Sequence, residues 1–347
     1  GFSKVLDHVK ALGLGVWPIE IDEQLSAVPF LPLTEADITR RKSIAVSRTL
    51  LQRFVYEVSQ VRKSASVWIL DDDFRVSTEL DDLIAALISC RDSSIDVALG
   101  GNSGAAPVPA SSLLRTQLVD LVHLLTWSSQ RRADEQFPDA KKLNLRWSSG
   151  RRDVHYDLSR WESDRLEIPF LPDLPPMSLA DGVTCVLQRA ERIFAGEPIT
   201  RAVAEMPVCQ PEAARASCWR GGNTFITDAT LLRDIPNMAP RVNGRPTRRS
   251  DMIWAANVLH RFGKSIKAFR IPMYHDRASE QPDEDDTHRL VDDILGYGFF
   301  TAYDEVLMNR TGTLPFTDVE RQRVHRLTRK YTTERLAAYR LSFWRVI

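Results

Sequence analysis

Three consecutive carboxylates follow one of the most apolar short segments of the chain. Ser66–Leu70 has the composition of a buried strand, and Asp71, Asp72 and Asp73 come directly after it. Neighbouring carboxylates repel one another unless a cation neutralises them. Oxygen ligands at a strand end suit Mg²⁺ or Mn²⁺ that holds a diphosphate. The pattern therefore predicts a divalent-cation site, although a solvated turn after a strand has the same composition.

Two further segments bear on this site. Arg48 lies in a predicted helix over Ser43–Val61, which would bring it towards the same sheet edge unless it is an ordinary surface residue. Gly221, Gly222 and Asn223 stand either where the backbone must approach a ligand closely or where the chain makes a tight turn.

Two more side chains could handle a proton or a metal ion. Asp251 opens a predicted helix over Ser250–Phe262, either as a carboxylate stabilised by the helix dipole or as a general base. His275 follows a predicted strand over Lys267–Pro272. A single histidine near a strand end is more often structural than catalytic, so its place among the other motifs carries the interpretation.

The elements that must position these residues alternate between two periodicities. Strand-sized apolar segments alternate with segments of helical spacing, which predicts an α/β layered fold. In such folds ligands bind beyond the carboxyl ends of the strands. The other predicted strands are Val16–Ile21 and Ile95–Leu99, and the other predicted helices include Leu113–Thr126, Ser178–Phe194 and a tail from His288.

Composition excludes several classes of protein. The 347 residues are 43% hydrophobic and 27% charged, which is ordinary for a globular chain and not for a disordered one. The 46 basic and 46 acidic residues balance, so no general nucleic-acid binding is expected. We expect no membrane span, since no run of 18 apolar residues occurs. The four cysteines form no CxxC pair, which favours a reducing, cytoplasmic location.

In their order along the chain, these motifs resemble those of the GT-A-fold glycosyltransferases, in particular the inverting family 2 group. That family carries A-R-N, D-x-D, G-G-N/S and E-D motifs, followed by a strand that leads to a histidine. The matching segments here are Ala45–Thr49, Asp71–Asp73, Gly221–Asn223, Ser250–Asp251 and Pro272–His275, within a resemblance that spans about Phe2–Arg277. Two positions depart from the pattern, because Thr49 replaces the asparagine and Ser250 replaces the glutamate.

The resemblance implies a GT-A-like, Rossmann-related fold with a mixed, mostly parallel sheet flanked by helices. It divides the chain into a nucleotide-sugar-binding half at 1–126, an inserted irregular or helical segment at 127–176, an acceptor and catalytic half at 177–279, and a helical C-terminal extension at 280–347. The first strand of the family would precede the helix Phe2–Leu12 and so lie before Gly1, unless the fold begins differently here.

The resemblance also implies a metal-dependent sugar transfer from a nucleotide-diphosphate donor, with a UDP-sugar favoured, to an acceptor hydroxyl. Asp73 and His275 would coordinate Mn²⁺ or Mg²⁺, and Asp71 or Asp72 would contact the metal or the ribose. Asp251 would be the base of an inverting displacement. The remaining donor-site residues would be Asp22 on the nucleobase, Arg48 on the nucleotide, and Gly221, Gly222 and Asn223 near the sugar or acceptor.

Two segments match no motif of the family. Trp127–Asp173 is rich in Trp, Arg and Asp, and is either an acceptor-recognition insertion or an ordinary packed subdomain. Pro240–Arg249 carries four arginines, and is either a mobile clamp on an anionic ligand or an exposed basic loop.

Three rival functions use similar residues. A haloacid-dehalogenase-type phosphatase would need Thr or Val at position 75, where this chain has Arg75. A sugar-activating nucleotidyltransferase would need a Gly-rich N-terminal loop that the sequence lacks. A catalytically degenerate GT-A-like domain that binds nucleotides or serves as a scaffold is the third alternative, which the Arg-rich helical tail favours slightly.

Overall fold

The computed structural model describes eleven segments of the chain, together with isolated positions near the N-terminus and between the segments. The segments are residues 44–62, 66–70, 74–76, 95–104, 124–138, 175–194, 215–216, 224–237, 240–275, 286–310 and 315–346. Among these residues, no helix combines the length and the apolar character that crossing a membrane requires.

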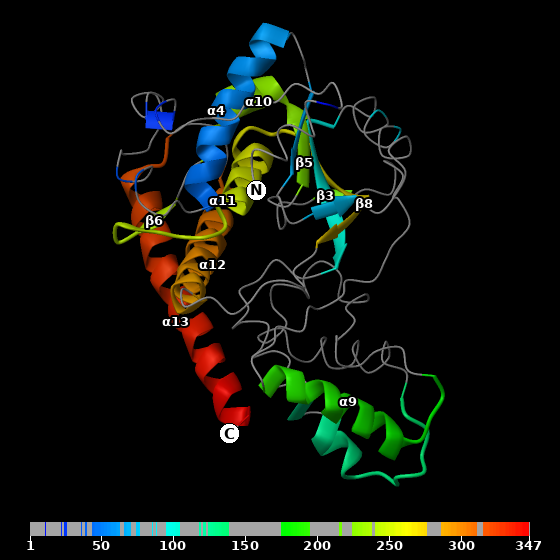
Figure 1. Ribbon diagram of the computed structural model, residues 1–347. Coiled ribbons are helices and arrows are strands. Elements are labelled where there is room, and N and C mark those ends of the chain that lie inside the picture. Colours follow the sequence, from blue (N-terminus) through cyan, green and yellow to red (C-terminus); the bar gives the residue numbers. More distant parts are fainter. Residues whose placement is uncertain are drawn as a thin grey trace.

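A mixed sheet forms one layer of the described structure (Figure 1). Its strands are β1 (Ser66–Leu70), β2 (Phe74–Val76), β3 (Val97–Gly104), β4 (Arg215–Ala216), β5 (Thr224–Asp228) and β8 (Ile266–His275). Their order is β1-β5-β3-β8-β2, and β4 also pairs with β8.

Strand direction separates the longer strands into two groups. β5 runs antiparallel to β1 and β3, whereas β3 and β8 are parallel. The three strands β1, β3 and β8 therefore point the same way. The sequence predicted a mostly parallel sheet, but most of the described ladders are antiparallel, because β5, β2 and β4 all run against their neighbours. A GT-A-like fold thus remains a proposal.

Helices cover one face of this sheet. They are α4 (Ile44–Arg62), α10 (Ala229–Asp234) and α11 (Ser250–Ala256), which continues into the π-helix η3 (Asn257–Arg261). Apolar side chains from the sheet, α10, α11, η3 and the next helix form the main core. Its buried members include Ile69, Val97, Leu231, Leu232, Ile253, Trp254, Val258, Ile266 and Phe300.

Trp254 is the largest aromatic side chain in this core, with 2% of its surface exposed, and its indole Nε1 donates to the backbone oxygen of Ile235. Replacing Trp254 with alanine is expected to lower the free energy of unfolding by about 3–5 kcal/mol, because a large cavity and an unpaired carbonyl result. Urea unfolding followed by circular dichroism measures this. Leu336→Ala, on a side chain that is 42% exposed, serves as the control and should cost less than about 0.5 kcal/mol.

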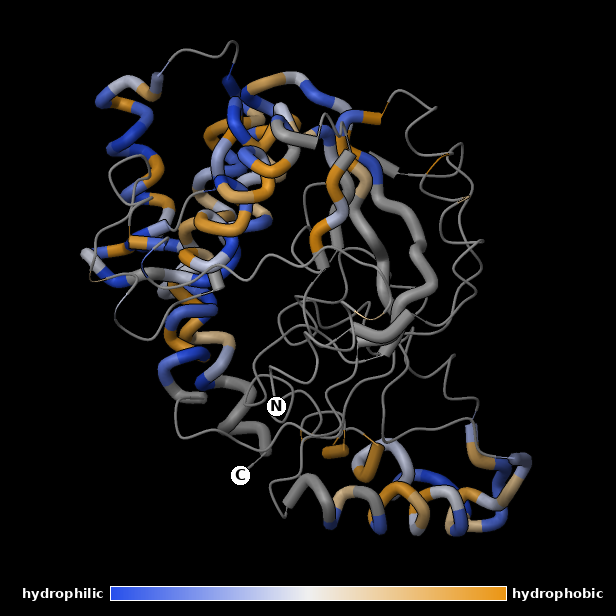
Figure 2. Tube along the Cα trace, turned by 45° about the horizontal axis from the view of Figure 1, so that its top comes forward, coloured by the Kyte–Doolittle hydropathy of each residue, from blue (hydrophilic) through white to orange (hydrophobic). Residues whose placement is uncertain are grey.

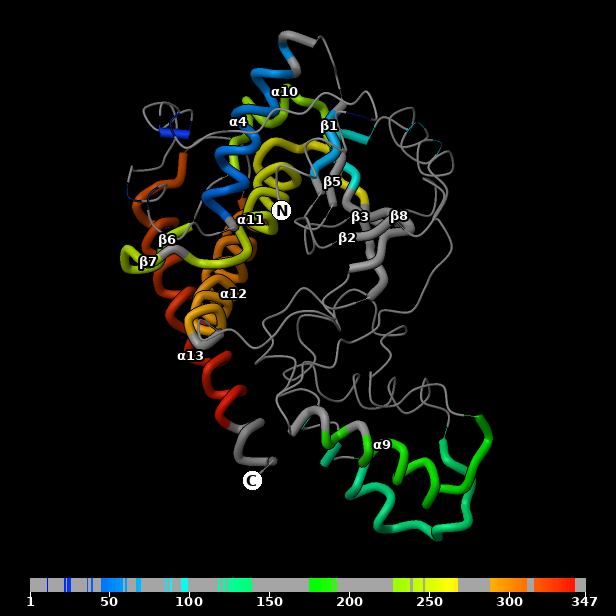
Figure 3. The backbone as a smooth tube through the Cα atoms, viewed as in Figure 1, coloured from blue at the N-terminus to red at the C-terminus, as the bar shows by residue number. Residues whose placement is uncertain are grey.

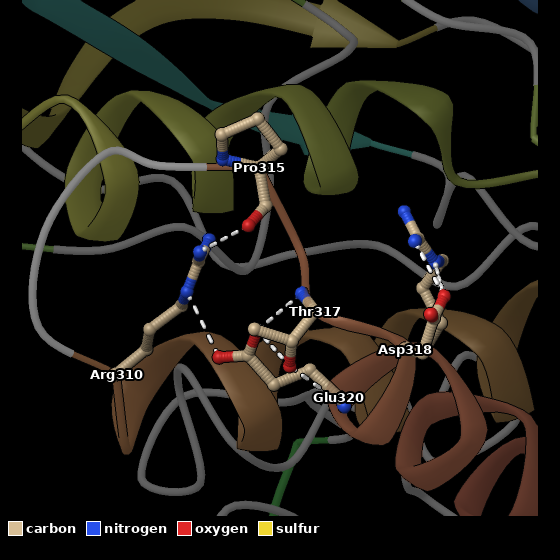
Figure 4. Close-up of polar contacts among 6 residues, drawn as sticks. Arg310, Pro315, Thr317, Asp318 and Glu320 are labelled. Carbon is tan, nitrogen blue, oxygen red and sulfur yellow. Dashed lines mark hydrogen bonds and ion pairs between the residues drawn. The ribbon is translucent and has the colours of Figure 1, made fainter.

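The predicted helical tail consists of two packed helices, α12 (Asp286–Met308) and α13 (Asp318–Val346). A Cβ atom on Gly298 of α12 would lie 2.1 Å from the hydroxyl of Thr332, so glycine allows the two helices to approach closely. Figure 4 shows how α13 begins. Thr317 and Glu320 form a reciprocal capping box, and Arg310 joins Glu320 to the carbonyl of Pro315.

A tyrosine–carboxylate contact also joins these two helices. The hydroxyl of Tyr331 donates to Glu305, which Arg323 also contacts at 3.2 Å. This bond lowers the pKa of Glu305 and raises the pKa of Tyr331 to about 12. The stability it contributes is therefore fully present between the two unfolded pKa values, is lost as pH falls through the lowered pKa of Glu305, and is lost as pH rises through about 12.

Tyr331→Phe should therefore destabilise the chain by about 1 kcal/mol at neutral pH, since Glu305 is partly exposed and the bond is screened by water. Denaturant unfolding measured from pH 3 to pH 8 tests this. The difference between the two proteins should shrink towards acid pH, and a difference independent of pH would contradict the assignment.

A second, smaller core lies apart from the sheet. Leu121, Leu124 and Phe137 pack against Leu179 and Val186 of α9 (Leu179–Phe194). Figure 2 shows hydrophobic and hydrophilic residues alternating along α9, as expected for a helix with one packed side. Leu121 and Leu124 lie in the predicted nucleotide-sugar-binding half, Phe137 in the predicted insertion and α9 in the predicted catalytic half, and their side chains share this core.

Candidate functional site

The sheet brings together the residues that flank three of the sequence motifs. Leu70, just before Asp71, is the register partner of Thr224, which directly follows Asn223. Phe74, just after Asp73, is the register partner of His275. Figure 3 shows β1 beside β5 and β2 beside β8. Two strand ladders thus join the borders of the Asp-rich, Gly-Gly-Asn and histidine motifs at one sheet.

The motif residues themselves are described only in part. Asp71, Asp72, Asp73, Gly221, Gly222 and Asn223 lie outside the described residues, as does the side chain of His275. The backbone of His275 ends β8 and is also the register partner of Gly104 in β3. His275 therefore occupies the end of a strand that is paired on both sides.

Arg48 and Asp251, which are 203 positions apart in the chain, meet in the structure. The Arg48 guanidinium lies 3.7 Å from the Asp251 carboxylate, and the two side chains are 12% and 18% exposed. α4 supplies the arginine, and the first turn of α11 supplies the aspartate. Two of the predicted site residues therefore form one mostly buried ion pair.

A buried polar network fixes the part of α4 that carries Arg48. The Thr49 hydroxyl lies 2.8 Å from the Ala45 oxygen and 3.1 Å from the Asn237 oxygen. The backbone N–H of Asn237 donates to Gln52 Oε1 at 2.8 Å. Thr49 stands where the family pattern has asparagine, and here it joins α4 to the chain beyond α10. This departure thus has a structural role.

The basic loop before Asp251 is an ordered hairpin rather than an unattached clamp. β6 (Arg241–Val242) and β7 (Arg245–Pro246) pair around Asn243 and Gly244, both with positive φ. Arg245 contacts Asp292 of α12 at 2.6 Å. Arg249 contacts both carboxylate oxygens of Asp293 at 3.1 Å. Two of the four arginines are thus neutralised within the chain, which favours the structural interpretation of this loop.

The sequence predicted that Asp22 follows the end of a strand, but the backbone of Asp22 belongs to a helix. Its backbone is helical, like those of Gln24 and Leu25, and its side chain is exposed. The apolar run Val16–Ile21, which suggested the strand, lies outside the described residues. The nucleobase contact of Asp22 was predicted from a place at the end of a strand, and the described backbone of Asp22 itself is helical.

Within the described part of the chain, His, Cys, Asp and Glu side chains form no group of three that could hold a metal ion. The predicted cation ligands Asp71–Asp73 and the side chain of His275 lie outside that part. Their chemistry fits the ion, since carboxylate oxygens with one imidazole suit Mn²⁺, and carboxylates alone suit Mg²⁺.

Sequence reasoning missed one residue that bears on the site, the buried Asp293. It lies in α12, a helix that the motifs do not reach, and its partner Arg249 was noted only as one of four loop arginines. The signal was present as paired doublets, Arg248-Arg249 and Asp292-Asp293. Nothing in their spacing showed that the two doublets meet.

Comparison with protein-family models, with curated proteins and with solved structures gave no match to this chain.

Proposed function

We propose that this chain is a GT-A-like, metal-dependent glycosyltransferase that moves a sugar from a nucleotide-diphosphate donor to an acceptor hydroxyl. One observation carries the proposal: Leu70 and Phe74, the two chain neighbours of Asp71–Asp73, pair with Thr224 and His275. Consecutive Cα atoms are about 3.8 Å apart, so chain neighbours of paired residues start close to one another. The residues that border three motifs far apart in sequence are thereby paired within one sheet.

The donor site in this proposal combines oxygen and imidazole ligands for a metal ion with the guanidinium cation of Arg48. Asp73 and His275 would hold Mn²⁺ or Mg²⁺, with Asp71 or Asp72 on the metal or the ribose. When bound, the metal offsets the negative charge that develops on the departing diphosphate. Arg48 contributes a permanent positive charge. Its side chain is 12% exposed, so the charge acts in a partly dehydrated environment.

Asp251 is the proposed base. Its carboxylate accepts the proton of the acceptor hydroxyl while that oxygen attacks the anomeric carbon. The bond between the anomeric carbon and the diphosphate oxygen breaks, and its electron pair leaves with the nucleotide diphosphate. One displacement of this kind inverts the anomeric centre. The first turn of α11 suits a carboxylate that must be ionised before the reaction.

A second candidate function is nucleotide binding without sugar transfer. The Arg48–Asp251 contact at 3.7 Å favours it, because an ion pair gives Asp251 a structural partner in the absence of any acceptor. Both functions require the same donor site, and they differ in whether Asp251 takes up a proton.

Calorimetric titration of the whole chain with UDP, GDP and their sugars, with and without Mn²⁺, tests the donor site. Metal-dependent binding of one nucleotide supports both candidate functions, and the absence of binding contradicts both. Release of free sugar or of a glycoside from the bound donor then separates an enzyme from a nucleotide-binding domain. Phosphate release from a generic phosphomonoester would instead favour the phosphatase alternative.

A further inference from the structure

We infer that the buried Arg249–Asp293 pair is a positioning device for Asp251, so that α12 forms part of the catalytic apparatus. The inference rests on the proposed function, since only there does Asp251 accept a proton. It extends that function to a helix that no motif reaches.

The backbone just before Asp251 is held in an unusual conformation. Arg249 precedes α11 with φ 74° and ψ 26°, the left-handed region that a residue with a Cβ atom rarely adopts. Such a conformation costs free energy and persists only where the surrounding structure enforces it. The carbonyl of Arg249 also accepts the amide hydrogen of Ile253 at 3.1 Å, the first turn of α11. The direction in which α11 begins therefore depends on Arg249.

α12 supplies the contacts that enforce this conformation. Both oxygens of Asp293 lie 3.1 Å from one Arg249 nitrogen, and the two side chains are only 5% and 10% exposed. The backbone N–H of Arg248 donates to the backbone carbonyl oxygen of Asp292 at 3.3 Å. A Cβ atom on Gly296 would lie 2.4 Å from the Arg248 oxygen, so glycine allows α12 to lie directly against this backbone.

These contacts place the Asp251 carboxylate rather than merely stabilise the fold. Asp251 is two residues after Arg249, and its carboxylate lies 3.7 Å from Arg48 on a different helix. A change in the direction of α11 would move the carboxylate away from both Arg48 and the acceptor hydroxyl. A displacement of about 1 Å is enough to cost around a hundredfold in rate.

Asp293→Asn is the variant that tests the inference. Its matched control is Asp304→Asn, which alters another buried carboxylate of α12, one that contacts His260 at 3.3 Å. In Asp293→Asn, kcat should fall about 10- to 100-fold with donor affinity unchanged, and the acid limb of the kcat–pH profile should shift. Asp304→Asn should leave kcat and this profile as in the wild type.

Hydrogen exchange provides a readout that does not depend on activity. Asp293→Asn should lower protection of the Ile253 amide at least tenfold more than that of the Ile235 amide, which donates to Leu231 in α10. If Asp293→Asn does not fold, Arg249→Met combined with Asp293→Leu removes the pair without leaving a buried charge, and the same two readouts apply.

Equal loss of protection at Ile253 and Ile235 would overturn the inference, as would a selective loss at Ile253 with unchanged kcat. A wild-type chain that binds no nucleotide and transfers no sugar would instead refute the proposed function, while the exchange result would still show whether Asp293 fixes the start of α11.

Discussion

Replacing Asp251 with asparagine is expected to lower the rate of sugar transfer by about 10²- to 10⁴-fold while leaving donor affinity within about twofold. The amide keeps the size of the carboxylate but accepts no proton from the acceptor hydroxyl. Initial rates at saturating donor, together with calorimetric titration of the nucleotide, measure the two quantities separately. The loss should appear in kcat, because the interaction matters only in the transition state.

Arg48→Gln provides the comparison that separates catalysis from ion pairing. Suppose that Asp251 serves only to neutralise Arg48 across their 3.7 Å contact. Arg48→Gln and Asp251→Asn should then lower the free energy of unfolding by similar amounts, and Asp251→Asn should cause no additional loss of activity. In our proposal, Arg48→Gln weakens nucleotide binding, whereas Asp251→Asn leaves it intact. Equal donor affinity and equal kcat in both variants would contradict the role of Asp251 as base.

Replacing Asp73 with alanine should abolish the effect of Mn²⁺ on nucleotide binding. Loss of one carboxylate ligand should weaken metal-dependent binding at least about tenfold, or 1.4 kcal/mol, because the diphosphate then meets uncompensated carboxylates. Titrations of the variant with and without Mn²⁺ should give the same weak affinity. Chelation of the metal from the wild type should produce the same result.

Asp318→Ala is the control for this substitution, since Asp318 lies on α13 with 85% of its side chain exposed. It should retain the full response to Mn²⁺. If nucleotide binding still responds to Mn²⁺ in both Asp73→Ala and Asp318→Ala, the metal binds elsewhere in the chain.

Local sequence patterns predicted several elements well. The apolar run Ser66–Leu70 is β1 with the same bounds, and the predicted helix Ser178–Phe194 is α9 from Leu179. Both are set by periodicity and nearby turn residues. The predicted strand Ile95–Leu99 was too short, because the glycines at 100 and 101 continue the ladder with β8 instead of ending it. A glycine lacks a side chain, but its backbone can still pair.

Long-range contacts were less accessible from the sequence. Motif order predicted that Arg48 and Asp251 belong to one site, and the structure shows their side chains in contact. The pairing of Arg249 with Asp293 did not follow, because it depends on how α12 packs on the chain before α11. The helical backbone of Asp22 was likewise not predicted, because periodicity alone does not separate strand from helix beside a short apolar run.

The most direct test of the central claim is the nitrogen hyperfine coupling of Mn²⁺ bound to the chain with UDP, measured by pulsed electron paramagnetic resonance. Our account predicts an imidazole coupling that disappears in His275→Ala and persists in His288→Ala, and predicts no bound Mn²⁺ in Asp73→Ala. A bound Mn²⁺ whose nitrogen coupling is unchanged in His275→Ala, or which remains bound in Asp73→Ala, would contradict a shared cation site at residues 71–73 and 275.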